Sequence, residues 1–256
     1  MLQMFGIYKL YLHKLESEIK KSNMPKHIAL ILDGNRRWAN KHNKKFVHTY
    51  LKGADVVENL LEWCKDLKIK IITLYVLSSE NLYRENKELN GLYNLIKNRL
   101  EKLYLDPKIH IIKMRVLAFG RIELLPKSIK IILEKLDKAT KDYDEYFINI
   151  ALAYGGHDEL IDATKKICYK IKKGILDIKD IDKRVIESNL YTSHLPQSSP
   201  DMILRTSGEK RLSGFLIWQS AYSELIFVDV FWPEFRKIDL IKAIKIFQKR
   251  SRRLGK

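Results

Sequence analysis

The stretch His27-Ile28-Ala29-Leu30-Ile31-Leu32-Asp33-Gly34-Asn35-Arg36-Arg37-Trp38 decides the fold of this 256-residue chain. Its first six residues are an apolar run that predicts a buried strand, and the polar Asp-Gly-Asn corner that follows predicts a turn into a helix. A carboxylate can hold a hard cation, while arginines and the N–H groups of a helix start bind phosphate oxygens. The corner therefore suits a metal-bound polyphosphate, although an isolated turn of this kind is more often an ordinary one with solvated arginines.

The composition fits a globular protein that binds anions. The chain is 46% hydrophobic and has a formal net charge of +17, which favours nucleic acid, acidic lipid or phosphorylated small molecules as partners. Two cysteines, Cys64 and Cys168, lie on the apolar sides of predicted helices, so we expect plain core residues and a reducing compartment. No apolar stretch is long enough to span a bilayer and no signal-peptide cleavage site follows the N-terminus, so a cytoplasmic protein is expected.

Strand and helix patterns alternate along the rest of the chain. Apolar or β-branched runs predict strands at 27–32, 69–77, 109–119, 147–153, 202–204 and 225–231. Helical spacing of apolar residues predicts helices at 53–67, 88–103 and 238–250, and from Pro126 and Asp158 onwards. The pattern predicts one α/β domain with a six-stranded, mostly parallel sheet covered by helices on both faces. Residues 1–23 form a further amphipathic helix that docks on the domain or, alternatively, lies on an anionic membrane surface.

Polar clusters follow several of these strands. They lie at 33–37, 78–84 and 205–213. In parallel sheets, ligands bind beyond the carboxyl ends of the strands, so the three clusters are expected to converge on one crevice.

The clusters carry phosphate-binding and metal-binding side chains. The arginines at 36, 37, 84, 205 and 211 are enough for two diphosphates or for a nucleic-acid backbone. Asp33 and Glu224 offer oxygen ligands for Mg²⁺, although Glu224 equally fits a plain surface position. The sequence has no dinucleotide-binding glycine motif and no Walker lysine loop, and its histidines lack the spacing of a zinc site.

Five motifs in order closely resemble the cis-prenyltransferase family of undecaprenyl and dehydrodolichyl diphosphate synthases, from residue 24 to about 250. They are Asp33 to Trp38, Leu74-Tyr75 to Ser78-Ser79-Glu80-Asn81, Tyr154-Gly155-Gly156, Arg205 to Ser213, and Trp218-Gln219 to Glu224 with Trp232-Pro233. The resemblance implies a catalytic domain at 24–250 with a hydrophobic tunnel, preceded by the helix at 1–23 and followed by a basic tail at 251–256. It also implies a homodimer. The reaction would be Mg²⁺-dependent condensation of isopentenyl diphosphate onto an allylic diphosphate (farnesyl or geranylgeranyl), with each new double bond cis, giving a long-chain lipid-carrier precursor.

The resemblance also implies roles for individual residues. Asp33 resembles the family's essential aspartate, with Glu224 as a second Mg²⁺ ligand. Asn81 matches a position that accepts a proton or orients a substrate, and because an amide is a poor base we favour orientation. The allylic diphosphate would be held by Gly34, Asn35, Arg36 and Arg37, with Trp38 flanking the prenyl chain. The isopentenyl diphosphate clamp would be Arg84, Arg205, Arg211 and Ser213, and the remaining substrate-binding residues are Ser78, Ser79, Glu80, Leu82 and Leu212.

Several positions depart from the family pattern. Phe46 and Tyr50 replace an arginine and a histidine, so one basic contact to the allylic diphosphate is missing or is supplied by His48, Lys44 or Lys45. Smaller departures are Leu77, Leu82, Glu85, Ser207 (for a glycine) and Lys210. The tail Arg253-Leu254-Gly255 is similar to a family motif that reaches across the dimer, and an accidental match on a basic tail is the alternative.

Two other functions compete with the enzyme. The family includes non-catalytic partner subunits, but retention of Asp33, Asn81, Arg205, Arg211 and Glu224 argues against that role. A nucleic-acid-binding protein is suggested only by the net charge, and no nucleic-acid partner is expected. We expect the enzyme to be cytoplasmic. Peripheral contact with a membrane, for release of the product, is a further option. Sequence alone leaves the chain length of the product and the preferred primer open.

Overall fold

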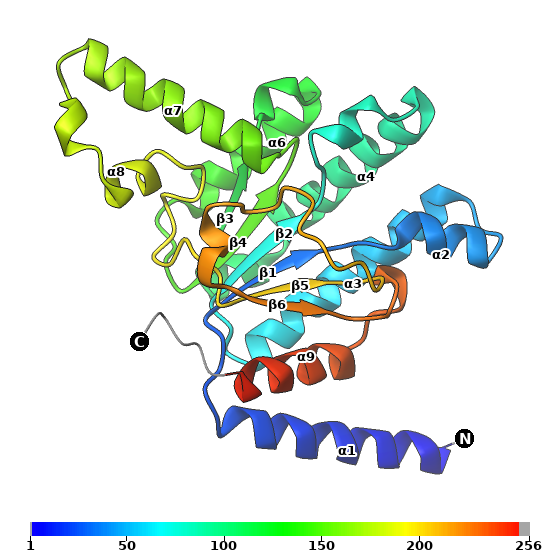
Figure 1. Ribbon diagram of the computed structural model, residues 1–256. Coiled ribbons are helices and arrows are strands. Elements are labelled where there is room, and N and C mark those ends of the chain that lie inside the picture. The colour runs from blue at the N-terminus through cyan, green and yellow to red at the C-terminus, as the bar shows by residue number, and fades with distance from the viewer. Residues whose placement is uncertain (1, 251–256) are drawn as a thin grey trace. The chain divides into compact units, whose positions relative to one another are not determined.

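The computed structural model describes residues 2–250 and has an α/β fold (Figure 1). Its six strands are β1 (His27–Ile31), β2 (Ile71–Tyr75), β3 (Met114–Phe119), β4 (Tyr146–Ala151), β5 (Met202–Arg205) and β6 (Glu224–Phe227). They form one sheet in the order β3-β4-β2-β1-β5-β6, and the pairs β1–β5, β5–β6 and β3–β4 are parallel. The predicted fold class and the six predicted strands are confirmed.

The helices also follow the predicted pattern. They are α1 (Leu2–Lys20), α2 (Asn35–Lys41), α3 (Phe46–Asp66), α4 (Asn86–Leu105), α5 (Pro107–Ile111), α6 (Lys127–Thr140), α7 (Gly156–Lys172), α8 (Lys183–Glu187) and α9 (Lys237–Lys249). Short 3-10 turns include η1 (Glu80–Tyr83) and η3 (Ile178–Asp180). None of the helices within residues 2–250 is both long and apolar enough to cross a bilayer.

The chain groups into two compact units whose segments alternate along the sequence. Unit 1 consists of the residues up to Ile72, Pro200–Arg211 and the residues from Tyr222 onwards, and unit 2 of Thr73–Ser199 and Leu212–Ala221. Neither unit is a run of consecutive residues, which agrees with the absence of a linker from the sequence.

In unit 1, the strands β1, β5 and β6 are in register through Ile28, Met202 and Glu224 at one end and Ile31, Arg205 and Phe227 at the other. Every residue of β1 and β5 is buried, as expected for strands covered on both faces.

Helix α1 docks against α9 in the same unit (Figure 1). Its residues Leu15 and Ile19 are 8% and 1% exposed. The Nζ of Lys237 on α9 lies 2.6 Å from Glu16 on α1, and the Nζ of Lys245 lies 2.8 Å from Glu18. The docking that we predicted for this helix is therefore seen at its C-terminal half.

In unit 2, β3 and β4 pair along their whole length, from Met114 opposite Tyr146 to Phe119 opposite Ala151. Helix α6 packs against β3 and against α4. The buried carboxylate of Glu159 on α7 accepts two hydrogen bonds in this unit. The hydroxyl of Tyr154 donates to it at 2.6 Å, and the amide of Gln219 donates to it at 3.0 Å.

Some predicted boundaries and environments were wrong. Residues 109–113 are not strand, because Asp106 caps a short helix by accepting from the N–H of Lys108 at 2.9 Å, and Lys113 then turns the chain at φ +48°. The β6 strand ends at Phe227 instead of residue 231.

One residue of α7 that we predicted to be buried, Cys168, is exposed. The buried face of this helix is formed by Gly156, Glu159, Ala163 and Ile167. Ile161 is therefore 48% exposed, and Cys168 is exposed as well. The prediction that Cys168 is a core residue was wrong, whereas the same prediction for Cys64 is confirmed.

Candidate active site

The corner after β1 has the geometry that its glycine allows. Gly34 has φ +105°, which favours glycine, and a Cβ there would lie 2.8 Å from the ring of Phe231 and 3.0 Å from Ser207. Helix α2 starts directly afterwards, and the N–H of Trp38 donates to the carbonyl of Gly34, four residues earlier, at 2.9 Å. The close fit at Gly34 brings the start of α2 against the loop that follows β5.

Asp33 binds two arginines with one carboxylate. Its Oδ2 accepts from Arg205 Nη2 at 2.7 Å and from Arg37 Nη2 at 3.2 Å, while Oδ1 accepts from the N–H of Gly34 at 2.6 Å. Burial raises the pKa of Asp33, but the hydrogen bond and the charge of Arg205, with help from Arg37 and Gly34, outweigh burial and leave the pKa below its ordinary value. Asp33 is therefore ionised at neutral pH.

The loop after β5 is folded onto the same corner. Arg205, the last residue of β5, is only 4% exposed, and the hydroxyl of Thr206 donates to the carbonyl of Asp33 at 2.6 Å. Ser207 has φ +77°, a backbone conformation that favours glycine. The serine adds a contact that glycine could not make, since its Oγ accepts from Arg37 Nη2 at 2.6 Å.

Glu209 connects Arg37 on α2 with Arg211 in this loop and was not among our predicted site residues. Its Oε1 accepts from Arg37 Nη1 at 2.7 Å, and its Oε2 pairs with Arg211 Nη1. Arg205 Nη1 in turn donates to the carbonyl of Arg211. In the sequence, Glu209 stands out only as a single acidic residue in an otherwise basic loop. Its contact with Arg37 follows from the fold and could not be read from the sequence.

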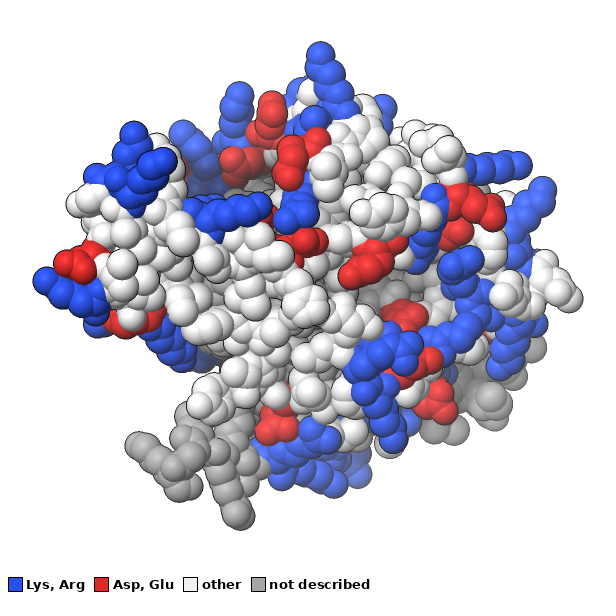
Figure 2. Space-filling view, turned by 45° about the horizontal axis from the view of Figure 1, so that its top comes forward, with Lys and Arg blue, Asp and Glu red and all other residues white. Residues whose placement is uncertain are grey.

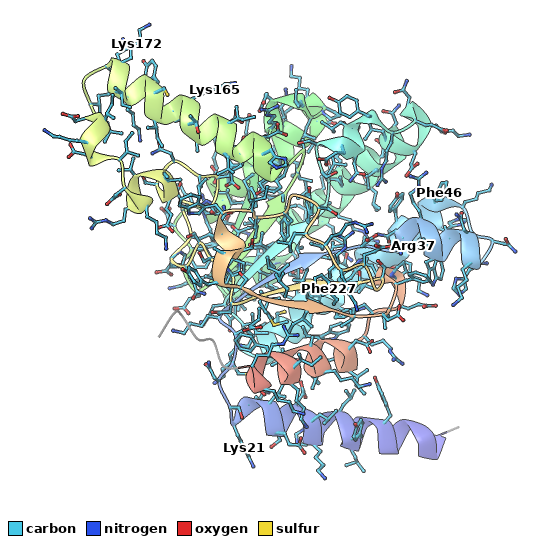
Figure 3. All side chains as sticks on the ribbon, viewed as in Figure 1. Lys21, Arg37, Phe46, Lys165, Lys172 and Phe227 are labelled. Atoms are coloured by element: carbon cyan, nitrogen blue, oxygen red, sulfur yellow. The ribbon has the colours of Figure 1, made fainter. Side chains whose placement is uncertain are left out.

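Aromatic rings support the basic residues of α2. The guanidinium of Arg36, an exposed residue, lies 5.6 Å from the ring centre of Phe46, the first residue of α3. Trp38 is buried, stacks on His42 with ring centres 4.3 Å apart, and has Lys52 Nζ 4.5 Å from its ring. Figure 3 labels Arg37 and Phe46 in this part of unit 1. The ring of Phe46 thus faces the guanidinium of Arg36.

The predicted site residues of unit 2 gather in two loops. The N–H of Asn81 donates to the carbonyl of Ser78 at 3.1 Å, and the N–H of Ser79 donates to the carbonyl of Tyr154 at 2.9 Å. Arg84 pairs with Glu88 at 3.0 Å. On η1, the turn between Ser79 and Arg84, Glu80 is exposed and Leu82 is half-buried.

The second loop of unit 2 carries Leu212 and Ser213. Leu212 is half-buried, and Ser213 is exposed with φ +49°. The Tyr75 hydroxyl lies 3.4 Å from the Ser213 carbonyl and 3.1 Å from that of Tyr154, the carbonyl to which the N–H of Ser79 also donates. That the loops of unit 2 and the corner of unit 1 face one crevice stays a prediction.

Glu224 does not join Asp33 within the chain. It is the first residue of β6 and is in register with Met202 and Ile28, whereas Asp33 follows the far end of β1. At 3.3 Å per strand residue, the five residues from Ile28 to Asp33 separate the two carboxylates by about 16 Å along the strands. Glu224 instead pairs with Arg250 at 3.1 Å.

The environments of these two carboxylates decide which of them suits a magnesium ion. Asp33 is ionised and 26% exposed, which suits Mg²⁺, because this ion keeps several waters and is often held by one or two carboxylates together with substrate phosphates. Within residues 2–250, no cluster of three or more His, Cys, Asp or Glu side chains could enclose a metal by itself. Asp33 fits as a magnesium ligand shared with a diphosphate, and Glu224 of the same chain does not fit beside it.

Comparison with known proteins agrees with this geometry. The family model described as "Putative undecaprenyl diphosphate synthase" matches residues 31–255. The tritrans,polycis-undecaprenyl-diphosphate synthase (geranylgeranyl-diphosphate specific) of Methanocaldococcus jannaschii is 46% identical over 98% of this chain and 90% of its own length. The protein of the same name from Pyrococcus horikoshii is 45% identical over 97% of this chain and 94% of its own.

Solved structures show the same fold. Lavandulyl diphosphate synthase from Lavandula x intermedia, in complex with dimethylallyl diphosphate, superposes with a TM-score of 0.88 and 28% identity over 91% of this chain and 99% of that one. A probable undecaprenyl diphosphate synthase from Campylobacter jejuni gives a TM-score of 0.73 at 29% identity, over 91% and 100%. The chain belongs to the undecaprenyl diphosphate synthase family and is a cis-prenyltransferase.

Proposed function

We propose that this cis-prenyltransferase is a Mg²⁺-dependent polyprenyl diphosphate synthase that adds isopentenyl diphosphate to geranylgeranyl diphosphate, or to farnesyl diphosphate as a second primer. The observation that carries the proposal is Asp33, an ionised carboxylate held by Arg205 and Arg37 at the corner after β1. An ionised carboxylate beside two arginines could hold a metal ion next to guanidinium groups that bind diphosphate, and this chemistry supports the proposal.

The arginines of unit 1 supply the charge for the two diphosphates. Arg36 and Arg37 on α2 would hold the allylic diphosphate, and Arg205 and Arg211 the diphosphate of isopentenyl diphosphate. Arg37 is now balanced by Asp33 and Glu209, so a bound diphosphate would take over guanidinium N–H groups that these carboxylates hold. Magnesium, when bound, supplies further positive charge to the leaving diphosphate, and Asp33 is the residue that would hold it.

In the reaction, the allylic carbon–oxygen bond breaks and the diphosphate leaves. The double bond of isopentenyl diphosphate forms the new carbon–carbon bond, and a proton is then lost from the adduct to give the new double bond. Asn81 would orient isopentenyl diphosphate for this step, with a phosphate oxygen or a water taking the proton. The buried ring of Trp38 contributes an apolar surface that keeps water from the reacting carbon.

The archaeal relatives favour geranylgeranyl diphosphate as the primer. The names of these relatives specify this substrate, and their sequences are 40% to 47% identical to this chain. The same names favour an undecaprenyl product. A homodimer, a cytoplasmic location and peripheral membrane contact for release of the product are further parts of the proposal. The tail Arg253-Leu254-Gly255, which we expect to act across such a dimer, lies outside the described residues.

The non-catalytic partner subunit remains the competing function, and nucleic-acid binding has less support. The first is disfavoured by the intact contacts of Asp33, Arg37 and Arg205. Figure 2 shows Lys and Arg side chains in separate groups mixed with Asp and Glu on the face in view, without the continuous basic stripe typical of nucleic-acid binders.

The test is an assay of the purified chain with labelled isopentenyl diphosphate, Mg²⁺ and each primer in turn, with and without EDTA. We expect elongation with geranylgeranyl diphosphate, weaker elongation with farnesyl diphosphate and none in EDTA. Failure with every allylic primer would refute the synthase, and activity that appears only after a second protein is added would favour the partner subunit.

A further inference from the structure

We propose that Asp158 is a positioning residue that, together with Arg121, fixes Ser79 and thereby the substrate-binding segment 78–84. This inference rests on the proposed function, because it gives a role to a residue of the site described above. All the contacts that carry it lie in unit 2.

Ser79 is held at two atoms. Its Oγ donates to Asp158 Oδ2 at 2.7 Å, and its N–H donates to the carbonyl of Tyr154 at 2.9 Å. The carbonyl of Ala153 lies farther from the Ser79 hydroxyl, at 3.4 Å. The hydroxyl proton is therefore directed to Asp158, and the Ser79 side chain has one preferred orientation.

Arg121 fixes the orientation of Asp158. Its Nη1 lies 3.2 Å from Asp158 Oδ1, so the two oxygens of this carboxylate have different partners. The same guanidinium lies 3.5 Å from Asp162, one turn farther along α7, and Asp162 also accepts from the hydroxyl of Tyr191. The hydrogen bond that Arg121 donates to Asp162 raises the pKa of Arg121, and the charge of Asp158 adds to this effect, so the guanidinium stays charged.

Two glycines make this arrangement possible. A Cβ on Gly155 would lie 2.9 Å from Asp158 Oδ2 and 3.2 Å from Ser79 Oγ, so a side chain there would push the two groups apart. Gly120, which precedes Arg121, has φ +123°, and a Cβ there would lie 2.1 Å from the carbonyl of Leu152. The turn that presents Arg121 therefore needs glycine.

The partial exposure of these groups indicates orientation more than stability. The side chains of Arg121 and Asp158 are 30% and 25% exposed. Ion pairs open to solvent in this way contribute little to folding. Their geometry, in contrast, determines where Ser79 points, and the backbone of Ser79 leads directly into Asn81 and Arg84. We therefore expect loss of Asp158 to change catalysis more than unfolding.

The kinetic test is a double-mutant cycle between Asp158→Ala and Ser79→Ala in the purified protein, measured as kcat/KM for isopentenyl diphosphate. Asp158→Ala should lower this value by about tenfold in the wild-type background and by less than twofold in the Ser79→Ala background. Asp158→Asn, which keeps an acceptor for Ser79 but loses the charge, should fall in between. Asp162→Asn is the matched control, because it faces the same guanidinium without contacting Ser79, and it should change kcat/KM by less than twofold. Equal effects of Asp158→Ala in both backgrounds, or no effect in either, would overturn the proposal.

A second measurement does not depend on activity. Amide hydrogen exchange should be faster in segment 78–84 of Asp158→Ala than in the wild type and unchanged in β4. Unchanged exchange in segment 78–84 would overturn the positioning role even if the wild type proved inactive. An inactive wild type with faster exchange in the variant would refute the synthase alone.

Discussion

Asp33 neutralises a buried arginine as well as preparing a site for substrate. Arg205 is 4% exposed, and its Nη2 lies 2.7 Å from the Asp33 carboxylate. A buried charge that loses its partner is costly. At this position, therefore, stability and function depend on the same carboxylate.

Asp33→Asn should lower both turnover and stability. The amide keeps the shape of the side chain but removes the negative charge that faces the Arg205 guanidinium at 2.7 Å, at a cost of about 1–3 kcal/mol in the free energy of unfolding. We expect kcat to fall by at least about 100-fold, because the neutral amide no longer balances the charges that bind metal and diphosphate. Urea unfolding and a turnover assay check both effects. Asp180→Asn, a change at an exposed position, is the control, and full activity of Asp33→Asn would contradict the proposed role.

The contribution of Asp33 to stability should depend on pH. The pKa of this carboxyl is lower in the folded protein than in the unfolded chain, where about 3.9 is usual. The stabilisation is then complete above the unfolded pKa and is lost as the pH falls through the folded pKa. The difference in unfolding free energy between wild type and Asp33→Asn should be constant from about pH 6 to 8 and shrink below about pH 4. Urea titrations at a series of pH values measure it, and a difference that grows on acidification would be inconsistent with the lowered pKa.

Phe46 should support the allylic diphosphate through Arg36. Its ring centre is 5.6 Å from the guanidinium, and an exposed cation–π contact contributes about 0.5–1 kcal/mol. Phe46→Leu removes the aromatic face and should raise KM for the allylic primer by about two- to fivefold, with KM for isopentenyl diphosphate unchanged. Phe46→Tyr keeps the face and should behave like the wild type. Equal KM values for the leucine and wild-type proteins would show that the ring does not position Arg36.

Among the elements, α1 is held to unit 1 by its C-terminal half. Ile19 is 1% exposed, whereas Leu10 is 73% exposed. Ile19→Ala should lower the free energy of unfolding by about 2–4 kcal/mol because it leaves a cavity next to α9, and Leu10→Ala should have little effect. Thermal or urea unfolding compares the two variants. Equal stability of both variants would mean that α1 does not pack on α9 in solution.

Sequence patterns predicted buried elements better than their ends. The short runs that became β1 and β5 are apolar except for His27 and Arg205, and the structure buries every residue of both strands. We placed the start of β3 too early because the residues around Ile109 are rich in β-branched side chains, which are typical of strands. The N-cap at Asp106 instead starts a short helix there. On α7, the choice between two apolar stripes depended on the fold, which buries Glu159 and leaves Ile161 exposed.

At the scale of the whole molecule, the candidate site was predictable where parallel strands end side by side. Asp33 and Arg205 meet because β1 and β5 are neighbours with parallel register, so the residues that follow them share one edge. Glu224 could not be placed in this way, since its position at the start of β6 follows from the register of that strand. Glu209 was missed because its partner Arg37 is 172 residues away in the sequence.

The most direct test of the central claim is the structure of the product made by the purified chain from geranylgeranyl diphosphate, isopentenyl diphosphate and Mg²⁺. Mass spectrometry gives the chain length, and NMR of the olefinic carbons gives the geometry of each double bond. We predict a long-chain polyprenyl diphosphate in which every added double bond is cis and the double bonds of the primer stay trans. New trans double bonds, or recovery of the unchanged primer, would contradict the assignment of this chain as a cis-elongating synthase.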